Sequence, residues 1–130
     1  MLDKVEYWLN LCDDNLKSAK LLFNGKQFLD AGFFCHQIAE KALKAVVASV
    51  TQETPPKIHD LKKLSKIGGI STELSAQQLA LLEKLVPLQI EARYPEYKCE
   101  ISKTLDPEFC KKILSETEDF LCWIKQWLGR

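Results

Sequence analysis

The sequence predicts an all-α protein: an antiparallel up-and-down bundle of four long helices and one short helix. Apolar residues recur at steps of three and four along most of the chain, which is the period of an amphipathic helix. No segment shows the alternating pattern of a strand, and short breaks at glycine or proline divide the chain into five helical stretches. Because the chain has 130 residues, we expect a single domain over residues 1–130 with one hydrophobic core.

The first two helices are predicted from their apolar pattern and their end signals. The first covers residues 5–23 and stops at Asn24-Gly25, a typical C-terminal cap. The second is predicted to begin after Asp30, as its N-cap, and to run to the break at Thr54-Pro55-Pro56. Apolar residues nearly encircle this second helix, so we expect it to be the central and most buried element.

Three further helices follow the double proline. A short one, "HDLKKLSKI", covers residues 59–67 and ends at Gly68-Gly69. The next opens with the capping-box pattern Ser75-Ala76-Gln77-Gln78, and Pro87 is predicted to end or kink it. The last helix begins at Asp106 as N-cap, with Pro107 at the first helical position.

Composition narrows the possible functions and surroundings. The 18 basic and 18 acidic residues cancel, which disfavours general nucleic-acid binding because that depends on a basic excess. The chain opens without a signal-peptide pattern, and no apolar run is long enough to span a bilayer. We therefore expect a cytoplasmic protein without a membrane partner.

The five cysteines are odd in number and form no C-x-x-C pair. A zinc site needs clustered ligands at short spacing, and a secreted disulfide framework has dense, even cysteines. We expect buried, reduced thiols, and we expect neither a metal nor another cofactor. Three tryptophans, Trp8, Trp123 and Trp127, lie near the two chain ends. Their aromatic area predicts that the terminal helices pack on each other or on a second subunit.

Polar residues within the helices give a first set of candidates. His36 lies one turn before Glu40, whose carboxylate could orient it as part of a site or satisfy it as a core histidine. Lys44 lies one turn after Glu40 in the order that favours pairing. Lys41 and Lys44, with Lys62 and Lys63, either contribute to a phosphate-binding face or cover solvated helix faces. His59 is expected to brace the loop beside a capping Asp60.

A stiff corner at residues 92–97, "ARYPEY", supplies the second set. Pro95 fixes its own φ and pushes Tyr94 to an extended conformation. A corner of this kind holds Arg93 at low entropic cost, and a guanidinium suits bidentate contact with phosphate. Tyr94 offers a face for stacking. The alternative is that Arg93 pairs with a carboxylate such as Glu40 and holds the bundle together.

Three stretches, in order, resemble the HEPN domain, the "higher eukaryotes and prokaryotes nucleotide-binding" helical bundle. They are "HQIAEKALKAVV" (residues 36–47), "PPKIHDLKKL" (55–64) and "ARYPEY" (92–97), and the resemblance covers essentially the whole chain. It implies a bundle of four to five helices that commonly dimerises and forms a cleft across the dimer axis. It also implies a partner, because small members often form toxin–antitoxin-like pairs with a separately encoded minimal nucleotidyltransferase.

Many members of this family are metal-independent ribonucleases whose signature is an arginine followed, after four to six residues, by a histidine. Counting from Arg93, the corresponding positions hold Lys98, Cys99 and Glu100. Proton transfer from a 2′-hydroxyl needs a positioned base, and arginine is a poor one near neutral pH. The chain therefore lacks the catalytic half of the signature, and we do not expect the usual enzyme activity.

From these observations we expect a homodimeric HEPN module that binds a nucleotide, RNA or a protein partner and acts with a nucleotidyltransferase. Arg93 is the candidate for phosphate, and Tyr94 for stacking or packing. His36, Lys41 and Lys44 are secondary candidates. One alternative is a metal-independent endoribonuclease whose base is His36 or His59. The other is a purely structural adaptor dimer, whose polar residues all serve packing.

Overall fold

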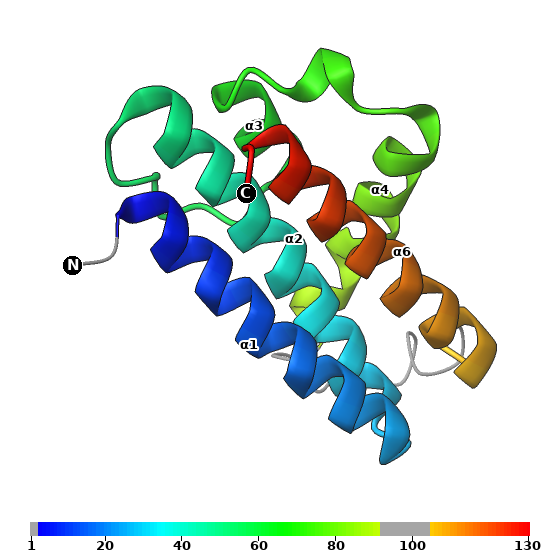
Figure 1. Cartoon of the computed structure of the whole chain (residues 1–130). Coiled ribbons are helices and arrows are strands. Elements are labelled where there is room, and N and C mark those ends of the chain that lie inside the picture. Colours follow the sequence, from blue (N-terminus) through cyan, green and yellow to red (C-terminus); the bar gives the residue numbers. More distant parts are fainter. Residues whose placement is uncertain (1–2, 92–104) are drawn as a thin grey trace.

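The computed structural model in Figure 1 describes residues 3–91 and 105–130. Within these residues it contains helices and no strand, so the all-α prediction is confirmed. The elements are α1 (Lys4–Asn24), α2 (Phe28–Thr51), α3 (Leu61–Ile67), the 3-10 helix η1 (Ser71–Glu73), α4 (Ala76–Glu91) and α6 (Pro107–Trp127). The 3-10 turn was not expected from the sequence.

A tight turn joins α1 to α2, and the two helices lie side by side in opposite directions (Figure 1). The N–H of Gly25 donates to the carbonyl of Leu21 at 3.0 Å, and Lys26 takes a left-handed φ of 63°. The prediction that α2 begins after Asp30 is wrong, because α2 already begins at Phe28. Tertiary packing explains the earlier start: the Phe28 ring lies 5.6 Å from that of Phe23, and both pack on the core.

Helix α2 is the centre of the molecule, as its apolar pattern predicts. It contacts α1, α3, α4 and α6, and nearly every residue from Ala31 to Ala48 is buried. The approach of α3 is particularly close, because a Cβ placed on Gly68 would lie 2.9 Å from Cγ1 of Val46. The residues of α2 therefore occupy positions where a polar side chain must find its partners inside the protein.

At the remaining helix ends, some predictions are confirmed and others differ from the structure. Ser75 and Gln78 form the expected capping box, and Asp106 accepts the backbone N–H of Phe109 at 2.7 Å. Helix α2 ends at Thr51, before the double proline, because Gln52 takes a left-handed C-cap conformation with a φ of 60°. Pro87 does not end α4, which continues to Glu91.

The tryptophans and the described cysteines differ in how far they are buried. Trp8, Trp123 and Trp127 are half-buried and pack against the core. Cys12, Cys35 and Cys110 are buried free thiols, whereas Cys122 is an exposed free thiol, so the expectation of buried cysteines is wrong for that residue. Cys99 lies outside the described residues. No described helix has the length and apolar character needed to cross a membrane.

Candidate functional site

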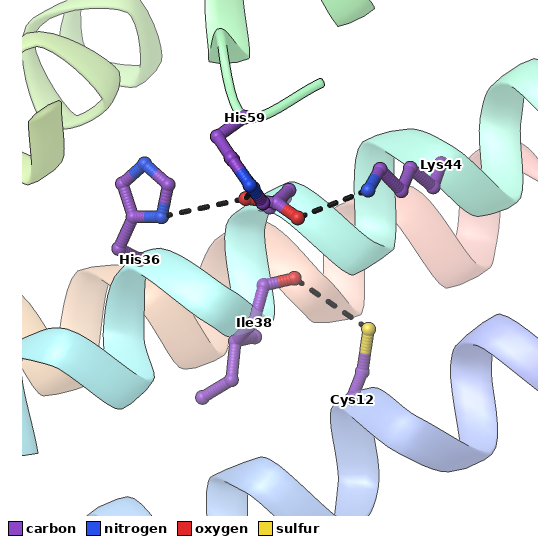
Figure 2. A network of polar contacts seen from close by, with 6 residues as sticks. Cys12, His36, Ile38, Lys44 and His59 are labelled. Atoms are coloured by element: carbon purple, nitrogen blue, oxygen red, sulfur yellow. Dashed lines mark hydrogen bonds and ion pairs between the residues drawn. The ribbon is translucent and has the colours of Figure 1, made fainter. Parts of the chain in front are cut away.

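A buried carboxylate, that of Glu40 on α2, is the centre of a polar cluster (Figure 2). Oε2 accepts a hydrogen bond from Nζ of Lys44 at 3.0 Å, and Oε1 lies 2.9 Å from Nδ1 of His59. Nδ1 of His36 lies 3.8 Å from the same Oε1. We name these four residues, His36, Glu40, Lys44 and His59, the Glu40 cluster.

Helical spacing and a capped turn bring the cluster together. His36 and Lys44 stand one turn before and one turn after Glu40, so all three side chains lie on the same side of α2. His59 comes from the connection between α2 and α3. Its neighbour Asp60 caps α3 by accepting the backbone N–H of Lys63 at 3.1 Å, as expected from the sequence. That cap fixes the chain direction at the residue after His59.

The carboxylate of Glu40 is buried and therefore needs partners inside the protein. Its side chain is only 4% exposed, and an ionised carboxylate in such a position needs a charged partner and satisfied oxygens. Lys44 provides the positive charge, and its Nζ also lies 5.4 Å from the centre of the Trp8 ring of α1. The predicted pairing of Glu40 with Lys44 is therefore confirmed, in a buried setting rather than on a solvated face.

His59 differs from the other members of the cluster because its side chain is 46% exposed. A carboxylate only accepts hydrogen bonds, so Nδ1 of His59 must carry the proton in its contact with Glu40. The neutral ring then keeps an unprotonated Nε2, and the protonated ring carries an N–H there. The cluster thus joins a buried charge pair to an imidazole that solvent can reach.

Lys41 lies beside the cluster and is half-buried. Burial lowers the pKa of its ammonium, and the neighbouring Cys12 and Glu40 partly oppose that effect. Lys41 directly follows Glu40 on α2, and successive residues of an α-helix point about 100° apart, so the two side chains do not share one face. The structure therefore brings His36 and Lys44 together around Glu40, with Lys41 at the margin.

Arg93 and Tyr94 lie outside the described residues. The described residues on either side of them nevertheless converge on one point of α2. A Cβ on Gly32 would lie 3.2 Å from Cδ1 of Leu88 and 3.4 Å from Cδ2 of Leu105. Gly32 stands one helical turn before His36, so Leu88 and Leu105 meet α2 one turn away from that member of the Glu40 cluster.

Several cavities line the described part of the molecule, and two of them are useful for comparison. One, of about 260 Å³, lies between α4 and α6 and is lined by residues that include Ser75, Asp119 and Trp123. The other, of about 250 Å³, is lined by Asp3, Lys4, Tyr7, Trp8 and Thr54. Among the described residues, no group of three or more His, Cys, Asp or Glu side chains is arranged to hold a metal ion.

Comparison with known families adds the deciding observation. The HEPN domain family matches residues 5–127, from the first turn of α1 to the last residue of α6. The chain belongs to the HEPN domain family. Searches among curated proteins and among solved structures found no match. Every residue of the Glu40 cluster lies within the matched HEPN domain, and so do Arg93 and Tyr94.

The sequence predicts His59 as a loop brace beside Asp60, and only the ribonuclease alternative makes it part of the HEPN site. The brace is confirmed, but its anchor is Glu40, nineteen residues away along the chain. The sequence does indicate that Glu40 needs partners, because it is an acidic residue in a nearly apolar helix. It does not indicate which residues these partners are. The sequence could not say which of the two histidines reaches it more closely.

Proposed function

We propose that this HEPN domain is a nucleotide-binding or partner-binding module of the cytoplasm. In this proposal it is one domain over residues 1–130, forms a homodimer, and acts with a separately encoded minimal nucleotidyltransferase in a toxin–antitoxin-like pair. In this proposal its long helices form an antiparallel up-and-down bundle. The observation that supports the binding role is the Glu40 cluster, three of whose four residues lie on the most buried helix.

Energetics favour a site over a purely structural adaptor. Replacing a buried ion pair with apolar residues of similar volume is often neutral or stabilising. An adaptor would therefore have little reason to keep Glu40 and Lys44 in a helix that is otherwise filled with apolar residues. Clusters of ionisable groups shielded from solvent are typical of functional sites. The half-exposed His59 links this cluster to the surface.

The proposed division of roles follows the chemistry of each residue. Arg93 contacts phosphate through its guanidinium, and Tyr94 stacks on a base or packs beside it. Leu88 and Leu105, described residues on either side of Arg93 in the sequence, both meet α2 at Gly32, one turn before His36. His36 and Lys44 support the site by holding Glu40.

Lys41 serves the same site at its margin. Its ammonium is half-buried and has a lowered pKa, caused mainly by burial. A partly desolvated ammonium interacts more strongly with an anion than a fully solvated one does.

Binding and mutation together test this function. We expect Arg93→Ala to weaken binding of AMP or of a short single-stranded RNA by about 1.5–3 kcal/mol, the usual contribution of a charge-assisted hydrogen bond. The free energy of unfolding of Arg93→Ala should differ from that of wild type by no more than about 1 kcal/mol if Arg93 is exposed to solvent. Lys111→Ala, which removes an exposed cation from α6, is the matched control. A loss of stability of 3–5 kcal/mol in Arg93→Ala would instead make Arg93 a buried structural partner.

Ribonuclease activity is the second candidate, and the contact of His59 with Glu40 is what favours it. An imidazole oriented by a carboxylate can act as a general base. Because no histidine stands at the expected distance from Arg93, we expect negligible RNA cleavage by repurified protein. Robust cleavage that disappears in both Arg93→Ala and His59→Ala would establish the enzyme and overturn the non-catalytic proposal.

A further inference from the structure

We propose that His59 is a phosphate contact of the site and that Glu40 acts as its positioning residue. This inference rests on the proposed binding function and assigns it a residue that the family signature does not include. The starting point is the 2.9 Å contact between Nδ1 of His59 and Oε1 of Glu40. Figure 2 shows the His59 side chain reaching over the helix that carries His36 and Lys44.

Glu40 fixes which nitrogen of His59 is available. Its carboxylate accepts a hydrogen bond from the protonated Nδ1, so Nε2 is left for a ligand. No hydrogen bond of Nε2 occurs within residues 3–91 and 105–130, and almost half of the His59 side chain is exposed. Rotation of the ring would break a contact to a carboxylate that is 4% exposed. The imidazole is therefore held in one orientation with its free nitrogen unused.

The charge around His59 selects an anion. Lys44 already neutralises Glu40, so a protonated His59 adds a net positive charge to the cluster. The neighbouring lysines Lys57 and Lys63 are exposed and form no ion pair with any residue that the structure describes. Between residues 57 and 63 the only carboxylate is that of Asp60, which accepts the backbone N–H of Lys63 as the cap of α3.

A phosphate group fits this environment better than a carboxylate does. It offers several acceptor oxygens to an imidazolium and to flexible lysine ammonium groups at once. Both a free nucleotide and the backbone of RNA carry such a group. AMP presents a terminal phosphate, whereas an oligouridine without terminal phosphates presents only internal phosphodiesters. Comparing the two ligands distinguishes the sources.

Two substitutions separate the contact with Glu40 from the contact with phosphate. The amide nitrogen of asparagine occupies about the place of Nδ1, and that of glutamine about the place of Nε2. His59→Asn should therefore keep the bond to Glu40 and melt within about 2 °C of wild type. It should still weaken AMP or oligouridine binding by about tenfold or more, because the phosphate contact is lost. His59→Gln should bind better than His59→Asn.

Titration calorimetry of wild type and both variants with AMP and with oligouridine decides the matter. If wild type binds and His59→Asn binds equally well, the role of His59 is wrong while the binding function stands. If wild type binds neither ligand, the proposed function fails as well. Nitrogen NMR of the wild-type histidines gives an independent check. Protonation of Nδ1 and a shift of the Nε2 signal on addition of AMP support the proposal, and an Nε2 signal that does not move overturns it.

Discussion

Lys44 and Lys62 form ion pairs of nearly equal length in different surroundings. The Lys44–Glu40 pair measures 3.0 Å with side chains 8% and 4% exposed, and the Lys62–Glu83 pair measures 2.9 Å with side chains 54% and 62% exposed. Removing one partner of a buried pair leaves an uncompensated charge, whereas solvent replaces the partner of an exposed pair.

This contrast gives a matched prediction. Lys44→Met should lower the free energy of unfolding by about 3–5 kcal/mol. Lys62→Met should lower it by less than about 1 kcal/mol. Urea unfolding at neutral pH measures both variants beside wild type. Equal losses in the two variants would mean that Glu40 does not depend on Lys44 for its charge compensation.

Two buried thiols, Cys12 on α1 and Cys35 on α2, give a prediction on alkaline stability. Burial raises the pKa of the Cys12 and Cys35 thiols to about 12, from an ordinary value of 9.0. Both folded values lie above the unfolded values, so the contribution of the neutral thiols is complete below pH 9 and is lost as the pH rises toward 12. The slope of stability against pH should reach about 1.4 kcal/mol per thiol for each pH unit.

The matched control is the double variant Cys12→Ala/Cys35→Ala. Its unfolding free energy should fall less steeply than that of wild type between pH 9 and 11, when both are measured by urea unfolding at each pH. The comparison of slopes cancels the titration of lysines and tyrosines, which both proteins share. Parallel curves for the two proteins would show that these thiols ionise as easily in the folded state as in the unfolded state.

Residue-level prediction from the sequence succeeded where the partner is local. The pairing of Lys44 with Glu40 follows from their spacing on one helix. The contact of His59 with Glu40 depends on how the connection after α2 returns across that helix, and no local pattern encodes that path. Arg93 and Tyr94 remain predictions, because they lie outside the described residues.

At the scale of the elements, helix ends provide the clearest test. Asp106 caps α6 with a side-chain bond to the N–H of Phe109, whereas Gln27 precedes α2 without a side-chain cap bond. Asp106→Ala should therefore cost about 1 kcal/mol of stability, and Gln27→Ala should cost little. Thermal unfolding of both variants checks the difference. If Gln27→Ala proves as damaging as Asp106→Ala, side-chain capping is not what holds the start of α6.

The same comparison explains which element boundaries the sequence predicts. Caps at Ser75, Asp106 and Asp60 are local chemistry and were found correctly. The start of α2 at Phe28 was missed because packing of its ring on Phe23, rather than a cap, sets it. Pro87 was expected to end or kink α4, but the helix extends beyond it to Glu91. Leu88, the residue after Pro87, packs against α2 at Gly32.

At the scale of the whole molecule, we predict a homodimer. Large apolar side chains remain exposed on α1, with Tyr7 at 51% and Leu21 at 73% exposure. A specific dimer that buried such residues would cover roughly 1,200 Å² or more in total. Light scattering at tens of micromolar should give about 30 kDa, twice the 14.9 kDa of one chain. A mass of one chain at that concentration would rule the dimer out.

Mapping of ligand contacts by NMR tests the location of the site most directly. Backbone amide signals of the labelled protein are followed while AMP is added. If the Glu40 cluster and Arg93 form the binding site, the largest shifts should fall in residues 36–44 and 57–61 and at residues 93 and 94. Shifts concentrated instead at the cavity between α4 and α6, around Ser75 and Trp123, would contradict this placement, and the absence of any shift at millimolar AMP would contradict nucleotide binding itself.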